Sequence, residues 1–154
     1  MVPDVTSRPE NEGILRRLRE RGHRGRPAVE RPEDVERPYE TLGTHPDLVA
    51  HLWDVLGGAL PTDCRFVLFD NPVLIHPETG IVFGFAGGTH TYAFRLPEPD
   101  RQAALAAGAT RVHTYPHPLH PPFDLEAVGP EWVFGRWVKG EEAWCRAAYE
   151  WAGG

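Results

Sequence analysis

The stretch that most constrains the fold runs from Cys64 to Leu96 and reads CRFVLFDNPVLIHPETGIVFGFAGGTHTYAFRL. It holds short runs of large apolar residues separated by Pro, Asp, Asn and Gly. Pro has no backbone N–H to donate to the hydrogen bonds of a central strand. Asp and Asn favour turns, and Gly takes positive φ without steric cost. The expected turns are Asp70-Asn71-Pro72, a four-residue loop at Pro77–Gly80 and a two-residue hairpin at Gly87-Gly88. The stretch is therefore predicted to form successive antiparallel β-strands.

These turns also predict which residues face one another across the strands. The expected pairs are Ile75 with Val82, Leu74 with Phe83, Phe85 with His90, Phe83 with Tyr92, and Ile81 with Phe94. Because neighbours on a strand point to opposite faces, this register puts Phe83 and Phe85 together on one large aromatic face. Both faces are apolar, which indicates a sheet that is covered on both sides.

Helical patterns flank this stretch. Helices are predicted over Pro46–Leu56, Pro97–Ala107 and Glu141–Ala152, and the last has an expected core stripe of Trp144, Ala148 and Trp151. Further strands are expected at Arg111–Tyr115 and within Glu131–Val138, where the segment Trp132–Trp137 is either core or a dimer face. The fold class is therefore predicted to be α+β. It combines an antiparallel sheet of about four to six strands with an N-terminal helix, a short middle helix and a C-terminal helix.

Charge divides the chain into two parts. Residues 1–40 hold nine arginines against nine acidic residues, and the remainder holds seven basic against thirteen acidic residues, so that the remainder carries the whole net charge of −6. We expect residues 1–40 to be a flexible, charged Arg/Pro-rich arm, with a short helix at 13–22. Residues 41–154 are expected to form a single domain. Because an acidic surface repels phosphate, nucleic acid is not an expected partner of that domain.

The sequence also bears on the cellular compartment. Cys64 and Cys145 are too few for a disulfide framework and form no CxxC pair. The first residues, MVPDVTSRPENEG, lack the apolar core of a secretory signal, and no apolar run approaches the length of a membrane span. We therefore expect a reduced, cytoplasmic protein without a membrane partner.

The order of the expected elements resembles that of the TfoX N-terminal domain family, which has the TfoX/YjbR-like fold. The residues that carry the resemblance are IVFGF at 81–85, YAFRL at 92–96, RQAALAAGA at 101–109 and WCRAA at 144–148. It covers roughly residues 46–152. The chain departs from the family at FVLFDNP, where the family has a Gly-rich stretch, and at the loop 113–120, which is basic in the family. The resemblance implies a role in regulation, as in bacterial competence, and transfers no catalytic residues.

A histidine-rich loop is the candidate metal site. His113, His117 and His120 lie within eight residues of one another, in the segment HTYPHPLH. Imidazoles are common ligands of Zn²⁺, and the prolines of the segment would stiffen it. The alternative is a solvated loop whose rings pack on Pro and Tyr115. His76 and His90 lie too far apart along the strands to share a metal ion, and each is expected at the end of the core with one nitrogen hydrogen-bonded.

The segment Arg24-Gly25-Arg26-Pro27 resembles the core of an AT-hook, in which two arginines read the minor groove of DNA. The acidic residues that follow, from Glu30 to Glu36, would repel phosphates. An Arg- and Pro-rich tail also produces such a segment by chance.

Three hypotheses for function follow. The first is a non-enzymatic regulatory or protein-interaction module without a cofactor, which binds a partner protein, with a homodimer left as an open alternative. The second is a metal-binding protein or a metal-dependent enzyme that uses Zn²⁺ at His113, His117 and His120. The third is contact with DNA through Arg24 and Arg26. No catalytic residues are predicted, and whether the protein is an enzyme is left open.

Overall fold

A computed structural model of the chain describes residues 2–19, 27–87, 91–113, 123–125, 128–136 and 141–154. The α-helices are α1 (Glu12–Arg19), α2 (Pro38–Thr41), α3 (Pro46–Ala50), α4 (Glu98–Ala106) and α5 (Glu142–Ala152). The strands are β1 (Val29–Glu30), β2 (Arg65–Leu68), β3 (Asn71–Ile75), β4 (Val82–Gly87), β5 (Thr91–Arg95), β6 (Val112–His113), β7 (Phe123–Asp124) and β8 (Trp132–Arg136). Short 3₁₀ turns are η1 (Pro9–Asn11), η2 (Pro32–Asp34) and η4 (Gly57–Ala59), and η3 (His51–Leu56) is a π-helix.

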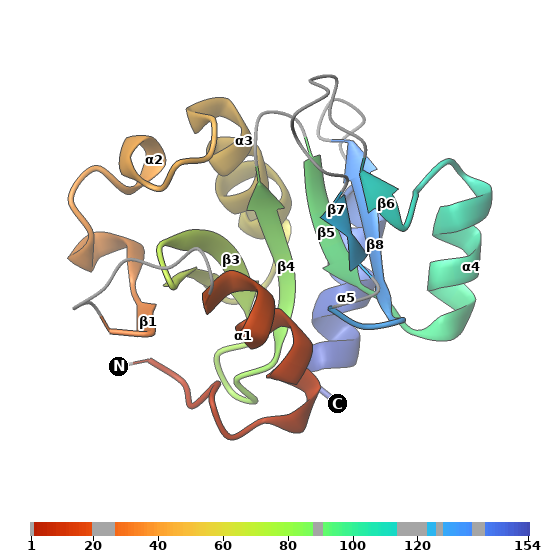
Figure 1. The fold of residues 1–154 in the computed structure, drawn as a ribbon, viewed down its shortest axis with the longest axis horizontal. Helices are drawn as coiled ribbons and strands as arrows, with labels where there is room; N and C mark the ends of the chain where they lie inside the picture. The colour runs from red at the N-terminus through yellow and green to blue at the C-terminus, as the bar shows by residue number, and fades with distance from the viewer. Residues whose placement is uncertain (1, 20–26, 88–90, 114–122, 126–127, 137–140) are drawn as a thin grey trace.

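Six of the described strands form one antiparallel sheet in the order β1-β2-β3-β4-β5-β8, and β6 pairs with β7 in a separate two-stranded sheet. The predicted α+β class is confirmed, as are helices close to the three predicted ranges. Figure 1 shows α1 in front of β3 and β4, and α5 behind the sheet. No helix among the described residues is long and apolar enough to cross a membrane.

Each face of the sheet has its own hydrophobic core, as two-sided apolar strands require. Behind the sheet, α3, the π-helix and α5 cover a core that includes Trp53, Phe83, Tyr92 and Phe94. In front, Ile14 and Leu18 of α1 pack against Phe66, Phe85 and Trp132. Trp132 is fully buried, so this end of the aromatic segment belongs to the core.

The front core corrects the expectation of a flexible arm for the described residues of this stretch, 2–19 and 27–40. Val5, Ile14 and Leu18 are each 1% exposed, and Val29 of β1 pairs with Leu68 of β2. The charged residues of this stretch suggested a solvated chain. Its few apolar residues, however, stand at helical spacing and cover one face of the sheet, since an apolar face left open to water is costly.

A β-bulge corrects part of the predicted register. Ile75 pairs with Val82 as predicted, but Leu74 pairs with Gly84 rather than Phe83, and Val73 with Phe85. The extra residue in β4 reverses the direction of every side chain after it. Phe85 therefore lies in the front core, whereas Phe83 stays in the core behind the sheet.

The hairpin between β4 and β5 also differs from the prediction. Gly87 pairs with Thr91, and Phe94 pairs with Gly84, so the pairings predicted from a two-residue Gly87-Gly88 turn are wrong. Residues 88–90, which separate Gly87 from Thr91 in the sequence, lie outside the described part. Short-range turn signals did not distinguish a two-residue from a three-residue loop, because Gly suits both.

The stripe predicted for the last helix is wrong at Trp151, whereas Ala148 is buried and Trp144 is half-buried against the core behind the sheet. Cys145, Ala148 and Ala152 of α5 are buried against the sheet, whereas Trp151 is 37% exposed. Small side chains let the helix approach the strands closely. The indole of Trp151 instead lies over the guanidinium of Arg95, 4.0 Å from ring centroid to Cζ. This contact is a cation–π interaction.

Candidate functional site

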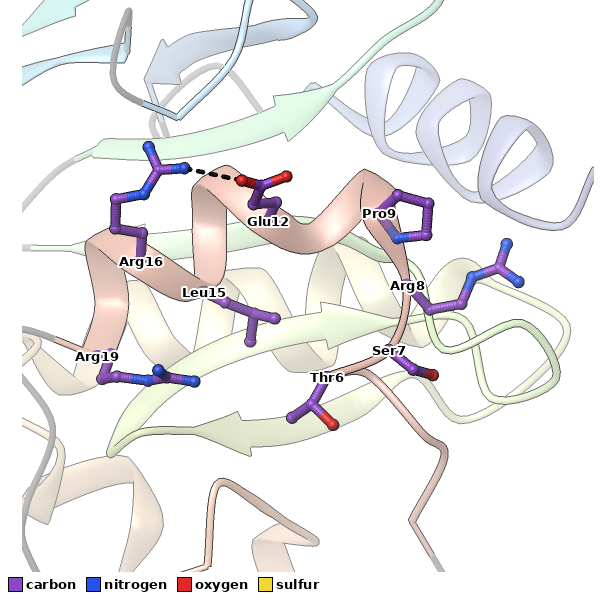
Figure 2. A pocket seen from close by; sticks show the side chains of 8 residues that line it. All are labelled: Thr6, Ser7, Arg8, Pro9, Glu12, Leu15, Arg16 and Arg19. Carbon is purple, nitrogen blue, oxygen red and sulfur yellow. Dashed lines mark hydrogen bonds and ion pairs between the residues drawn. The ribbon is translucent and has the colours of Figure 1, made fainter.

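The candidate site is a groove between residues 6–9 and α1, called here the α1 groove (Figure 2). Its volume is ≈ 640 Å³, within the range of about 300–1,000 Å³ typical of ligand sites. Its lining residues are Thr6, Ser7, Arg8, Pro9, Glu12, Leu15, Arg16 and Arg19. Three guanidinium groups, one carboxylate and two hydroxyls therefore surround an apolar floor.

A turn at Asp4 shapes the outer wall of the groove. The Asp4 carboxylate accepts hydrogen bonds from the Ser7 backbone N–H (3.4 Å) and the Thr6 hydroxyl (3.4 Å), and the Ser7 hydroxyl donates to it as well. Short polar side chains commonly bond to the backbone a few residues on and so stabilise turns. The hydrogen bonds from Ser7, followed by those from Thr6, lower the pKa of Asp4 below its ordinary value. Asp4 is thus ionised at neutral pH.

Asn11 anchors this wall to the sheet. Its side chain is fully buried, and its Oδ1 accepts from the backbone N–H of Val82 (2.9 Å). Its Nδ2 donates to the carbonyl oxygens of Val5 (2.9 Å) and Gly80 (2.8 Å). Gly80 has φ +77°, and a Cβ there would lie 2.1 Å from the carbonyl oxygen of Asp4. Only glycine permits this close approach, so the groove is built on a rigid contact with the β3–β4 hairpin.

Two ion pairs border the groove, one exposed and one half-buried. Arg16 Nη2 lies 3.3 Å from Glu12 Oε1, with side chains 61% and 77% exposed. Arg8 Nη2 lies 3.2 Å from Glu10 Oε2, with side chains 38% and 31% exposed. The exposed Glu12–Arg16 pair contributes at most about 1 kcal/mol, so its partners exchange readily. In Figure 2 the Arg8 side chain extends away from α1, whereas Arg16 and Glu12 lie together along one rim.

The floor of the groove is apolar, and Arg19 on its lining contacts an aromatic ring. Leu15 is 7% exposed and lies between Arg19 and the segment that carries Ser7 (Figure 2). The Cζ of Arg19 lies 5.2 Å from the centroid of the Phe69 ring. Phe69 and Asp70 form the turn between β2 and β3, with φ of +47° and +62°. The groove can therefore receive an apolar group on Leu15 and an anionic group on the arginines at the same time.

A second hollow, of ≈ 380 Å³, lies at the end of the π-helix beside Asp54, Gly58, Asp63 and Arg65. Its charged groups are already paired. Arg65 donates to both oxygens of Asp63 at 2.9 Å, and the Tyr39 hydroxyl donates to Asp54 at 2.8 Å. Bidentate pairs of this kind are among the strongest in proteins. The Tyr39 bond ties α2 to the π-helix, and Arg65 of β2 also lies 3.5 Å from Glu33, so these contacts have a structural role.

Of the predicted metal ligands, only His113 falls within the described residues, and only its backbone does so in detail. It ends β6 and pairs with Phe123 of β7. His117 and His120 lie outside the described residues, so the hypothesis stays a prediction. Among the residues that are described, no group of three or more His, Cys, Asp or Glu could hold a metal ion.

Arg24 and Arg26, the predicted DNA contacts, lie outside the described residues, as does His90. His76 is 7% exposed, and its Nδ1 accepts from the backbone N–H of Glu78 at 3.2 Å. This agrees with the expected histidine at the end of the core. Burial raises the pKa of the Cys64 thiol to about 11 and that of Cys145 to about 12, so neither is a nucleophile at neutral pH.

The residues of the α1 groove were not predicted as a site. Sequence patterns indicated a helix at 13–22 with Ile14 and Leu18 on one side. The same spacing places Glu12, Arg16 and Arg19 on one helix face together with Leu15, because residues three and four apart are neighbours. The helix wall of the groove could therefore have been found from this spacing. The second wall comes from residues 6–9, whose position depends on the hydrogen bonds between Asn11 and the β3–β4 hairpin.

Comparison with known proteins gave no match to a family model, to a curated protein or to a solved structure. The resemblance to the TfoX N-terminal domain family therefore stays an expectation. The function has to be argued from the groove itself.

Proposed function

We propose that this protein is a non-enzymatic protein-interaction module that binds an extended segment of a partner protein in the α1 groove. The observation that carries the proposal is the combination of an apolar floor at Leu15 with a rim of exposed arginines in a groove of ≈ 640 Å³. Arginine is enriched in protein–protein interfaces, where its fork binds carboxylates while its stem packs on apolar groups.

The chemistry of the groove favours binding over catalysis. Its hydroxyls, those of Thr6 and Ser7, donate to Asp4. A carboxylate whose pKa is lowered is a poor general base at neutral pH, so it would not activate Ser7 as a nucleophile. Guanidinium groups keep their protons, and they serve to hold anions rather than to transfer protons.

The shape of the groove favours a segment of chain over a compact ligand. It is open to solvent along the face between residues 6–9 and α1, as Figure 2 shows. The wall is fixed to the sheet by Asn11, so it is already formed before a partner arrives. A preformed groove loses little conformational entropy when it binds, which favours recognition of short segments.

Binding to an array of N-acetylated, C-amidated octapeptides of varied sequence tests the proposal, with affinities of the best binders measured by calorimetry. The variant Thr6→Trp fills the groove from an exposed position without entering the core. We expect it to weaken binding by about tenfold or more while the urea midpoint stays unchanged.

The matched control is Val55→Trp, which adds the same indole at a site that is 49% exposed and lies outside the groove. It should leave peptide affinity unchanged. Peptides that bind Thr6→Trp as tightly as the original protein would refute the assignment of the groove.

A further inference from the structure

We infer that the bound segment presents one carboxylate beside an apolar side chain, and that this carboxylate displaces Glu12 from Arg16. The inference rests on the proposed function and names the chemistry of its partner. It follows from the charge of the groove, from the exposure of the Glu12–Arg16 pair and from the position of Leu15.

The charges that face the groove leave room for one anion. Its lining residues carry three guanidiniums and a single carboxylate, that of Glu12. Arg8 is paired with Glu10, which is not a lining residue, and its side chain extends away from α1 (Figure 2). Arg16 is paired with Glu12, and Arg19 forms no ion pair among the described residues, so a single carboxylate from a partner would balance the lining. A phosphate group, with nearly twice the charge, would exceed it.

Glu12 is an internal competitor for that carboxylate. It lies four residues before Arg16 on the same helix, and its side chain is 77% exposed. Pairs at this spacing on a helix surface are weak, because solvent screens them and both side chains lose rotamer freedom. A partner carboxylate that is also held by apolar contact with Leu15 has the advantage, since the apolar contact fixes it beside Arg16 before the ion pair forms.

Arg19 and Arg16 are placed to share the incoming group. They are three residues apart on α1, so they are neighbours on the helix surface, and both line the groove together with Leu15. Arg19 is steadied by the Phe69 ring, which leaves the edge of its guanidinium directed to hydrogen-bond partners. A carboxylate over Leu15 could therefore accept from both arginines.

The test uses two synthetic peptides. One is Ac-Gly-Ser-Leu-Glu-Leu-Ser-Gly-NH₂, and the other has Gln in place of Glu, so that only the carboxylate differs. Each is titrated into the protein by calorimetry at low salt. We expect the Glu peptide to bind about tenfold more tightly than the Gln peptide, and the difference to shrink at high salt. Arg19→Gln should bring the Glu peptide close to the affinity of the Gln peptide.

The decisive variant is Glu12→Gln, because it removes a carboxylate and yet should strengthen binding. We expect the Glu peptide to bind about two- to fivefold more tightly, with the Gln peptide unchanged. The matched control is Glu40→Gln, since Glu40 forms a comparable exposed pair with Arg37 (3.4 Å) away from the groove. It should change neither affinity.

The outcomes separate the two proposals. If both peptides bind equally and Thr6→Trp weakens both, the interaction module stands and the carboxylate inference fails. If neither peptide binds, or if Glu12→Gln leaves or weakens the affinity for the Glu peptide, the inference is overturned. If the Glu peptide binds Thr6→Trp undiminished, the proposed function at this groove fails as well.

Discussion

At the scale of single residues, Asn11 holds the N-terminal segment to the sheet. Its amide makes three hydrogen bonds, all to backbone groups, and two of these groups belong to the β3–β4 hairpin. An asparagine fits because it offers an acceptor for one N–H and two donors for two carbonyls. Aspartate would lose both donors and would bury a charge, and an apolar residue would leave all three backbone groups without a partner.

We predict that Asn11→Ala lowers the free energy of unfolding by about 2–4 kcal/mol, because buried backbone groups that lose their partners retain the full cost of desolvation. Urea denaturation followed by circular dichroism measures the change. Ser7→Ala removes an exposed hydrogen bond of the same segment and should stay within about 0.5 kcal/mol of the original protein. Equal stability of Asn11→Ala and Ser7→Ala would show that Asn11 is not an anchor.

At the scale of elements, the bulge in β4 determines which side chains of this strand point to each face of the sheet. Phe83 stays in the core behind the sheet, and Phe85 turns to the front, where it lies 5.3 Å from Trp132 between ring centroids. Gly84 follows the bulge and faces Phe94. A Cβ at Gly84 would lie 2.9 Å from the nearest atom of the Phe94 ring, so the ring occupies the space of the missing side chain.

We therefore expect Gly84→Ala to destabilise the protein by about 1–3 kcal/mol, because the added methyl group overpacks the core behind the sheet. Thermal or urea unfolding measures this. Gly58→Ala is the control, since a Cβ at Gly58 meets no atom within 4 Å, and it should change stability by less than about 0.5 kcal/mol. A neutral effect of Gly84→Ala would mean that Phe94 can move aside without cost.

At the scale of the whole molecule, the sheet lies between two cores whose residues come from both ends of the sequence. The front core joins α1 to strands near the C-terminal end, such as β8, and the core behind joins α3 to α5. Cys64 and Cys145 meet in the core behind the sheet, with exposures of 1% and 0%. Burial disfavours their thiolate forms and so links the stability of the whole domain to pH.

Stability should fall as the pH rises above about 9. In the unfolded chain the thiols lose their protons near 9.0, whereas burial raises the pKa of Cys64 to about 11 and that of Cys145 to about 12. The folded state therefore binds more protons than the unfolded state in this window. Folding stability is fully present below pH 9 and declines from there through pH 11, by at most about 1.4 kcal/mol per pH unit for each thiol. Burial also raises the pKa of Tyr92, which acts in the same direction.

Urea midpoints measured between about pH 8 and about pH 10.5 test this dependence. The double variant Cys64→Ala/Cys145→Ala is the control: it should be less stable at pH 8 but should lose less stability as the pH rises. The same slope in both proteins would contradict a role of the thiols.

Much of the fold could be predicted because its signals are local. The apolar runs of residues 64–96 and the helices near 46–56, 98–106 and 142–152 follow from short-range spacing, and the loop at Pro77–Gly80 follows from turn chemistry. The register after Phe83 could not be predicted, since a bulge depends on how side chains from distant strands pack, such as the ring of Phe94 beside Gly84. The groove could not be predicted from local signals either. Its outer wall is held to the sheet through a buried hydrogen bond between residues 71 positions apart, Asn11 and Val82.

The sequence by itself determined the α+β class, the antiparallel order of the central strands and the charge asymmetry of the chain, because periodicity, turn residues and charge act over a few residues. Only the tertiary structure decided that residues 2–19 belong to the core and that α1 and residues 6–9 form a groove. Burial of one sheet face depends on the free energy of the whole assembly, and no local pattern records it.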